Sequence, residues 1–164
     1  MKVKLVFFYI LMVLFIATDV FIFIEAGTDA SGSSNQSMGI TQMLVDFVRL
    51  FNPNSEFVTN PDFAHHVVRK LVGHFGLFGV SGILTTADLM LIDEGLSNKK
   101  VQIIISSLGA GITVAIFSEV LQSFTPGRAF AFADIGIDFA GYILFGGITL
   151  LIGLLIHHHK EKKE

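Results

Sequence analysis

Four long apolar stretches constrain the fold of this chain more than any other feature. Each holds about twenty residues, the length that an α-helix needs to cross the hydrocarbon core of a bilayer. Of the 164 residues, 52% are hydrophobic and only 15% are charged, which is typical of a membrane-embedded protein. The predicted spans are residues 3–24, 70–92, 101–124 and 135–156. The sequence therefore predicts an all-α polytopic membrane protein with four transmembrane helices in a single domain over residues 1–164.

The segments between the spans are polar. The predicted outer loop, outer turn and cytoplasmic tail are residues 25–68, 125–134 and 157–164. Within the outer loop, apolar residues recur with helical spacing and predict a short amphipathic helix along the membrane surface: Met43, Leu44, Phe47, Val48 and Phe51. Further on, Asn60 and Pro61 form a helix-start signal, with Asn60 as the cap.

The first span has an alternative interpretation as a cleaved signal peptide, because Ile24-Glu25-Ala26 weakly resembles a cleavage site. Its apolar run is longer than the usual hydrophobic region of a signal peptide, which favours a retained helix. The chain contains no Cys, which excludes disulfides and a Cys nucleophile. Its net charge of −3 gives no basic surplus, so no nucleic-acid partner is predicted.

The placement of Lys and Arg predicts the orientation. With both termini in the cytoplasm, that side carries seven basic residues: Lys2, Lys4, Lys99, Lys100, Lys160, Lys162 and Lys163. The outer side carries four: Arg49, Arg69, Lys70 and Arg128. Because basic residues are enriched on the cytoplasmic side of membrane proteins, both termini are expected inside.

Ionisable residues interrupt the apolar pattern where the third and fourth spans meet. Pro126 cannot continue a helix and Gly127 allows a turn, so the two spans are expected to form a hairpin there. On the first helix of this hairpin, Glu119 and Gln122 are three residues apart and share a face. On the second, Asp134 and Asp138 are four apart and share another face. These faces are expected to meet near the extracytoplasmic membrane face, with Arg128 available to both.

These residues resemble the signature of the VanZ-like family, which reads E-x-x-Q-x-F-x-P-G-R followed by D-x-x-x-D-x-x-G. The matching residues are Glu119, Gln122, Phe124, Pro126, Gly127, Arg128, Asp134, Asp138 and Gly141. The resemblance implies a role in resistance to lipoglycopeptide antibiotics of the teicoplanin type, or in envelope stress.

A second block resembles the family's R-K-x-x-H-F, and here it reads Arg69-Lys70 followed by His74-Phe75. Three residues separate Lys70 from His74 where the family usually has two, which would turn His74 by about 100° relative to Arg69 in a regular helix. The chain also carries Asp138 where the family usually has Asn.

Together with the role that the resemblance implies, the polar residues indicate a site that binds or modifies an amphiphile such as a membrane lipid, a lipid-linked wall precursor or a lipoglycopeptide. The predicted ligand-binding residues are Arg69, Lys70, Gln122, Arg128 and Asp134. Among them, the guanidinium groups of the two arginines suit phosphate and carboxylate. If the protein is an enzyme, which the sequence leaves open, Glu119 or Asp138 is the candidate general base and His74 its acid or orienting partner.

Two alternatives accompany this interpretation. In a non-enzymatic adaptor or small transporter, the same charges would tie helices together, with Arg128 paired to Asp134 and Glu119. The amphiphile-binding interpretation predicts no cofactor. A divalent cation held by Glu119, Asp134, Asp138 and water is the alternative, because hard cations prefer oxygen ligands.

Overall fold

The computed structural model describes residues 2–92 and 96–162, and this part of the chain contains helices and turns but no strand. The helices are α1 (Lys2–Gly27), α2 (Ala30–Arg49), α3 (Glu56–Thr59), α4 (Pro61–Val68), η1 (Arg69–Gly76), α5 (Leu77–Ile92), α6 (Leu96–Ser123) and α7 (Phe132–Glu161). Four helical stretches are long and apolar enough to cross a membrane: Val3–Gly27, Pro61–Ile92, Lys100–Ser123 and Phe132–His159. The predicted all-α class with four candidate spans is confirmed.

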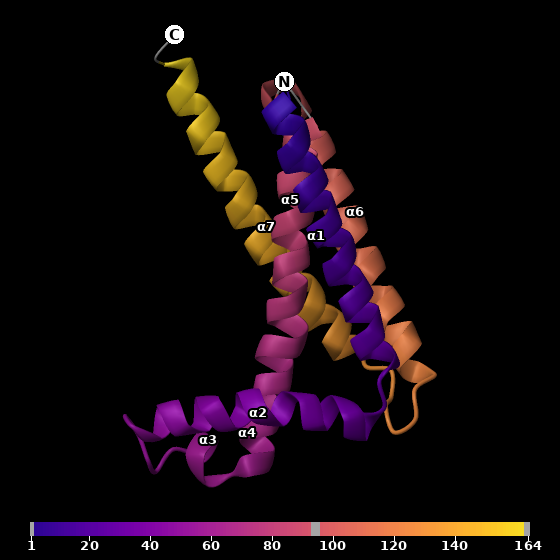
Figure 1. Ribbon diagram of the computed structural model, residues 1–164, viewed down its shortest axis with the longest axis vertical. Helices are drawn as coiled ribbons and strands as arrows, with labels where there is room; N and C mark the ends of the chain where they lie inside the picture. Colours follow the sequence, from indigo (N-terminus) through magenta and orange to yellow (C-terminus); the bar gives the residue numbers. More distant parts are fainter. Residues whose placement is uncertain (1, 93–95, 163–164) are drawn as a thin grey trace.

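Helix α5 lies at the centre and packs against α1, α6 and α7, and α7 crosses it at an angle so that the C-terminal part of α7 diverges from the other helices (Figure 1). Helix α2 crosses one end of this bundle, beside α3 and α4, and both chain termini lie at the opposite end (Figure 1). An even number of spans requires the two termini to share a side, and the structure has this arrangement. Which side faces the cytoplasm stays a prediction from the Lys and Arg count.

The closest helix packing lies between α5 and α7, where glycines let the two backbones approach each other. A Cβ atom at Gly141 would collide with the backbone of Phe75, and one at Gly82 would collide with the backbone of Tyr142. The rings of Phe75 and Phe145 pack edge to face nearby, with centroids 5.7 Å apart. These contacts hold the beginning of α7 against α5 and against η1, which carries Arg69, Lys70 and His74 of the predicted site.

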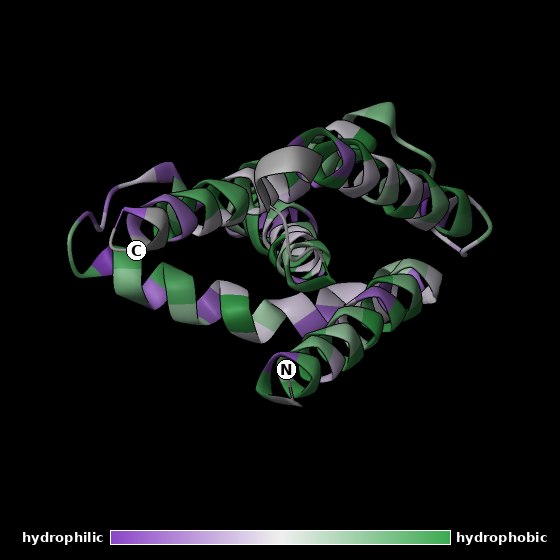
Figure 2. Cartoon of the chain, turned by 90° about the horizontal axis from the view of Figure 1, so that it is seen from above, coloured by the Kyte–Doolittle hydropathy of each residue, from purple (hydrophilic) through white to green (hydrophobic). Residues whose placement is uncertain are grey.

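The outer faces of the bundle are apolar. Hydrophobic residues cover most of the long helices in Figure 2. Large side chains such as Leu5 on α1, Phe117 on α6 and Leu151 on α7 are more than half exposed. A water-soluble monomer rarely exposes apolar surface of this extent, whereas lipid would cover it at no cost.

Helix α2 is longer than the short helix expected around Met43–Phe51, because it begins at Ala30 in a segment expected to be a loop. Asp29 caps it by accepting a hydrogen bond from the Gly32 amide at 2.6 Å, and this bond lowers the pKa of the Asp29 carboxyl. Polar residues of the first turns find tertiary partners, such as Ser37 with His65 Nε2 at 2.7 Å. A loop-like composition is therefore helical here because of contacts with other segments, and the position of α2 along a membrane surface stays a prediction.

Two other helix boundaries bear on the site. Helix α4 begins at Pro61, and the Asn60 side chain accepts a hydrogen bond from the Phe63 amide at 3.1 Å, so the predicted cap is confirmed. Helix α7 begins at Phe132, which brings Asp134, expected in the outer turn, into its first turn. The same helix continues through His157–His159, expected in the tail, to Glu161.

Candidate functional site

A buried polar cluster of Lys70, His74, Glu119, Asp134 and Asp138 lies at the end of the bundle nearest α2. Lys70 and His74 stand on η1, and they pair with Asp134 and Asp138 on α7 respectively. Lys70 Nζ forms an ion pair with Asp134 Oδ1, and His74 Nδ1 hydrogen-bonds Asp138 Oδ1 at 2.9 Å. The pairs repeat four residues apart on both helices, because both run away from this end of the bundle.

The third acidic member of the cluster comes from α6. Glu119 is fully buried, and its Oε2 accepts a hydrogen bond from the backbone amide of Ala131 at 2.9 Å. Its other oxygen, Oε1, is buried without a hydrogen-bond partner among the residues described, and so is Oδ2 of the fully buried Asp138. Buried polar atoms without partners are costly, so their presence in one cluster marks it as a candidate site.

The helix that carries Lys70 and His74 is a π-helix over Arg69–Gly76. A π-helix closes its hydrogen bonds between residues five apart, so it accommodates one more residue per turn than an α-helix. Arg69 and His74 are five residues apart and both line the same cavity. The rotation of His74 expected for a regular helix therefore does not apply, because the helix is not regular where the extra residue occurs.

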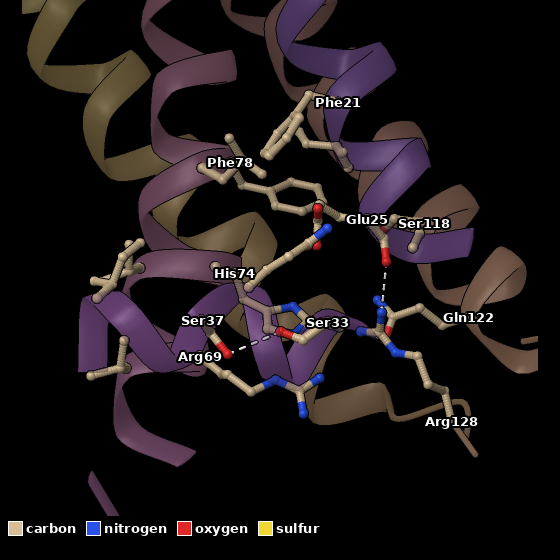
Figure 3. A pocket seen from close by; sticks show the side chains of 18 residues that line it. Phe21, Glu25, Ser33, Ser37, Arg69, His74, Phe78, Ser118, Gln122 and Arg128 are labelled. Atoms are coloured by element: carbon tan, nitrogen blue, oxygen red, sulfur yellow. Dashed lines mark hydrogen bonds between the residues drawn. The ribbon is translucent and has the colours of Figure 1, made fainter. Parts of the chain in front are cut away.

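The cavity next to the cluster has a volume of about 480 Å³ and lies between α1, α2, η1, the start of α5 and α6. Its apolar lining comes from Phe21, Ile22, Ala26, Ile40, Val68, Val72, Leu77 and Phe78. Its polar lining comes from Glu25, Ser33, Gln36, Ser37, Arg69, His74, Ser118, Gln122 and Arg128. In Figure 3, Phe21 and Phe78 lie toward the bundle interior, whereas Arg69 and Arg128 lie toward the end covered by α2. The cavity is thus apolar at one end and cationic at the other.

The Arg128 side chain is hydrogen-bonded to other groups of the protein. Its guanidinium donates to Gln122 Oε1 at 2.5 Å and to the Glu25 carbonyl at 2.7 Å, with a longer contact to the Thr28 carbonyl at 3.5 Å. Burial lowers the pKa of Arg128, and the positive charge of Arg69 lowers it further. The two guanidinium groups are therefore close enough to repel each other across the cavity.

Arg69 is the freer of the two guanidinium groups. Within the described residues it has no hydrogen bond from its side chain and no ion pair, although it is only partly exposed. A half-buried guanidinium that faces a cavity without an acidic partner is a candidate for binding an anion. The nearest acid of the cavity wall, Glu25, is itself engaged: the Gln36 amide nitrogen, when turned toward it, donates to both carboxylate oxygens at 2.5 and 2.8 Å.

All five residues of the cluster belong to the two sequence blocks, and so do Arg69, His74, Gln122 and Arg128 of the cavity. A family model described as VanZ/LLP1 matches residues 6–153. The chain belongs to the VanZ/LLP1 family. Neither the comparison with curated proteins nor the comparison with solved structures gives a match.

The predicted site residues of this VanZ/LLP1 protein lie at one end of the bundle, in two adjoining groups. Arg69, His74, Gln122 and Arg128 line the cavity, whereas Lys70, Glu119, Asp134 and Asp138 form the cluster behind it. His74 belongs to both groups. Lys70, expected to bind a ligand, is instead paired with Asp134. Arg128 forms no ion pair with Asp134 or Glu119 in the described part of the chain.

Sequence reasoning missed the contribution of α1 and α2 to the cavity. Glu25 lies in the last turn of α1, and three polar residues of α2 also line the cavity: Ser33, Gln36 and Ser37. Their spacing of three and four residues would place them on one face of a helix, which is the signal that could have found them. That signal applies only once residues 30–42 are known to be helical.

Proposed function

We propose that this VanZ/LLP1 membrane protein binds an amphiphile with an anionic headgroup in the cavity, at the extracytoplasmic membrane face. The candidates are a membrane lipid, a lipid-linked wall precursor or a lipoglycopeptide, and the family resemblance connects such binding with teicoplanin-type resistance or envelope stress. An acyl chain would lie against Phe21 and Phe78, and the headgroup would reach Arg69 and Arg128. The observation that carries the proposal is Arg69, a cation on the cavity wall with no acidic partner among the described residues.

The shape of the cavity supports an amphiphile over a purely polar ligand. Ligand cavities of this size are typically apolar with a few polar groups that fix orientation, and the lining here follows that pattern. An anion at the cationic end would relieve the repulsion between Arg69 and Arg128. The proposal requires binding alone. If the protein also catalyses a reaction, His74 would act as the acid or base, because it belongs to both the cavity and the cluster.

Arg69→Ala is expected to lower the affinity for phosphatidylglycerol by roughly 10-fold or more, because a charge-assisted hydrogen bond contributes about 1.5–3 kcal/mol. Native mass spectrometry of the detergent-solubilised protein with added phosphatidylglycerol would measure the bound fraction. Arg49→Ala is the matched control, since Arg49 is exposed on α2 and pairs only with Asp46. In cells, Arg69→Ala is expected to raise teicoplanin susceptibility at an unchanged protein level. Equal lipid binding and equal susceptibility in the two variants would contradict the proposal.

The second candidate is a non-enzymatic adaptor or transporter in which the charges hold helices together. The bonds of Arg128 favour this role for that residue, because they join the α6–α7 turn to the end of α1. If Arg128 is mainly structural, Arg128→Ala lowers thermal stability by about 1–3 kcal/mol through the orphaned carbonyl and amide acceptors, whereas Arg69→Ala leaves stability unchanged. Heating the purified variants and measuring the folded fraction by size-exclusion chromatography distinguishes the two roles. A stable Arg128→Ala protein that has lost lipid binding would place Arg128 with the ligand instead.

A further inference from the structure

Four side chains of the buried polar cluster each have one polar atom bonded within the protein and one that is not. Asp138 Oδ1 is hydrogen-bonded to His74 Nδ1 at 2.9 Å, Lys70 pairs with Asp134 Oδ1, and the Ala131 amide donates to Glu119 Oε2 at 2.9 Å. The atoms that make no hydrogen bond within the described residues are His74 Nε2, Asp134 Oδ2, Glu119 Oε1 and Asp138 Oδ2. Three of these four residues, His74, Glu119 and Asp134, lie close enough together to share one partner.

The spacing of these groups suits a metal ion. His74 Nε2 and Asp134 Oδ2 are 3.9 Å apart, too far for a hydrogen bond but less than twice a typical zinc–ligand distance of about 2.0–2.2 Å. One donor atom from each of His74, Glu119 and Asp134 lies within 4.8 Å of the others. Glu119 adds independent support, because it is fully buried and its Oε1 has no partner among the described residues.

The charge of the cluster points the same way. When the carboxyl groups of Glu119, Asp134 and Asp138 are all ionised and His74 is neutral, Lys70 is the one cation within the cluster. Two negative charges are then left in a region that water barely reaches, and a divalent cation would neutralise them.

We propose that His74 Nε2, Glu119 Oε1 and Asp134 Oδ2 bind a divalent cation of the zinc type. An imidazole with two carboxylates is a donor set that suits Zn²⁺, whereas an all-oxygen set would suit Mg²⁺ or Ca²⁺. His74 also lines the cavity, so the proposed cation would lie next to it. The proposal does not depend on the amphiphile, although an anionic headgroup in the cavity could reach the cation.

Asp138 is a positioning residue in this arrangement. Metal-binding histidines commonly donate their other ring N–H to a carboxylate, which fixes the tautomer and the ring orientation. The bond between Asp138 Oδ1 and His74 Nδ1 has this geometry and leaves Nε2 as the electron-pair donor.

The test measures zinc content rather than activity. The full chain would be purified in detergent with a tag free of histidine, in a background of His157→Gln, His158→Gln and His159→Gln, because that tract could bind zinc by itself. After incubation with Zn²⁺ and gel filtration, we expect about one zinc per chain by elemental mass spectrometry, and a rise in melting temperature that equal Mg²⁺ does not produce. Less than about 0.1 zinc per chain with no thermal shift would overturn the proposal.

Variants then assign the ligands. His74→Gln and Glu119→Gln are expected to abolish stoichiometric zinc, whereas His66→Gln, an exposed histidine on α4, keeps it. Asp138→Asn is expected to weaken zinc affinity by about 10- to 100-fold in a folded protein. A purely structural Asp138 would leave zinc affinity unchanged, and that result would remove Asp138 from the arrangement. Zinc retained in full by His74→Gln would place the metal elsewhere and overturn the site. If a ligand variant does not fold, the zinc content of the wild-type protein and the zinc affinity of Asp138→Asn still test the proposal.

Discussion

Gly141→Ala is expected to destabilise the protein by about 3 kcal/mol or more, near the upper end of the cost of overpacking a core. The added Cβ would lie 2.9 Å from the carbonyl carbon of Phe75 and closer still to its oxygen. Both atoms belong to backbone, so no side chain can rotate away to make room. To accept the methyl group, α7 has to move away from η1, which also separates Asp138 from His74 and Asp134 from Lys70.

Two other glycines of α7 serve as matched controls. Nothing lies within 4 Å of a Cβ added at Gly136 or Gly147. Alanine is a better helix former than glycine by about 1 kcal/mol, so Gly136→Ala and Gly147→Ala are expected to be neutral or slightly stabilising. The chain contains no Trp, so circular dichroism or size-exclusion chromatography after heating is the practical measurement. Equal melting temperatures for Gly141→Ala and Gly147→Ala would show that α7 does not approach η1 as closely as described.

His74→Leu is expected to cost about 3–5 kcal/mol, the range for leaving a buried charge without its partner. Asp138 is fully buried, and His74 provides the one hydrogen bond that its carboxylate makes within the described residues. Without the imidazole, both carboxylate oxygens would lack partners in a helix that spans the membrane. The expected result is a lower melting temperature and a lower yield of folded protein.

A double substitution distinguishes the cost of an unpaired buried charge from the cost of lost packing. In His74→Leu with Asp138→Leu, no charge is left unpaired, so most of the stability is expected to return. His66→Leu is the control for replacing a histidine of the same helical region, because His66 is exposed on α4. If the double variant is less stable than His74→Leu alone, the bond between His74 and Asp138 does not explain the cost.

Both stability predictions bear on the function. Gly141→Ala disturbs the site by moving a helix, whereas His74→Leu disturbs it by removing a member of both the cavity and the cluster. Arg69→Ala touches neither the helix contact nor the cluster pairs, so its effect on lipid binding should occur in a fully stable protein. This contrast allows the amphiphile proposal to be judged separately from folding.

The sequence determined the four spans, because the length and apolarity of a membrane helix are set by the bilayer and are visible in any window of about twenty residues. It also determined the cap at Asn60, which depends on local backbone chemistry alone. The gathering of Glu119, Asp134 and Asp138 at one end followed from their spacing around the Pro126-Gly127 turn. The two family blocks then predicted membership of the VanZ/LLP1 family, and the match over residues 6–153 confirmed it.

Only the tertiary structure decided how these residues divide between cavity and cluster. The π-helix at Arg69–Gly76 redirects His74, and nothing in the local sequence requires it. Helix α2 begins at Ala30 in a segment whose Gln36 and Ser37 find partners on α1 and α4, which a composition typical of loops conceals. Lys70 pairs with Asp134 and leaves the cavity to Arg69 because the glycines of α5 and α7 bring those helices together. Spans and caps depend on neighbours in sequence or on the solvent, whereas the site depends on neighbours in space.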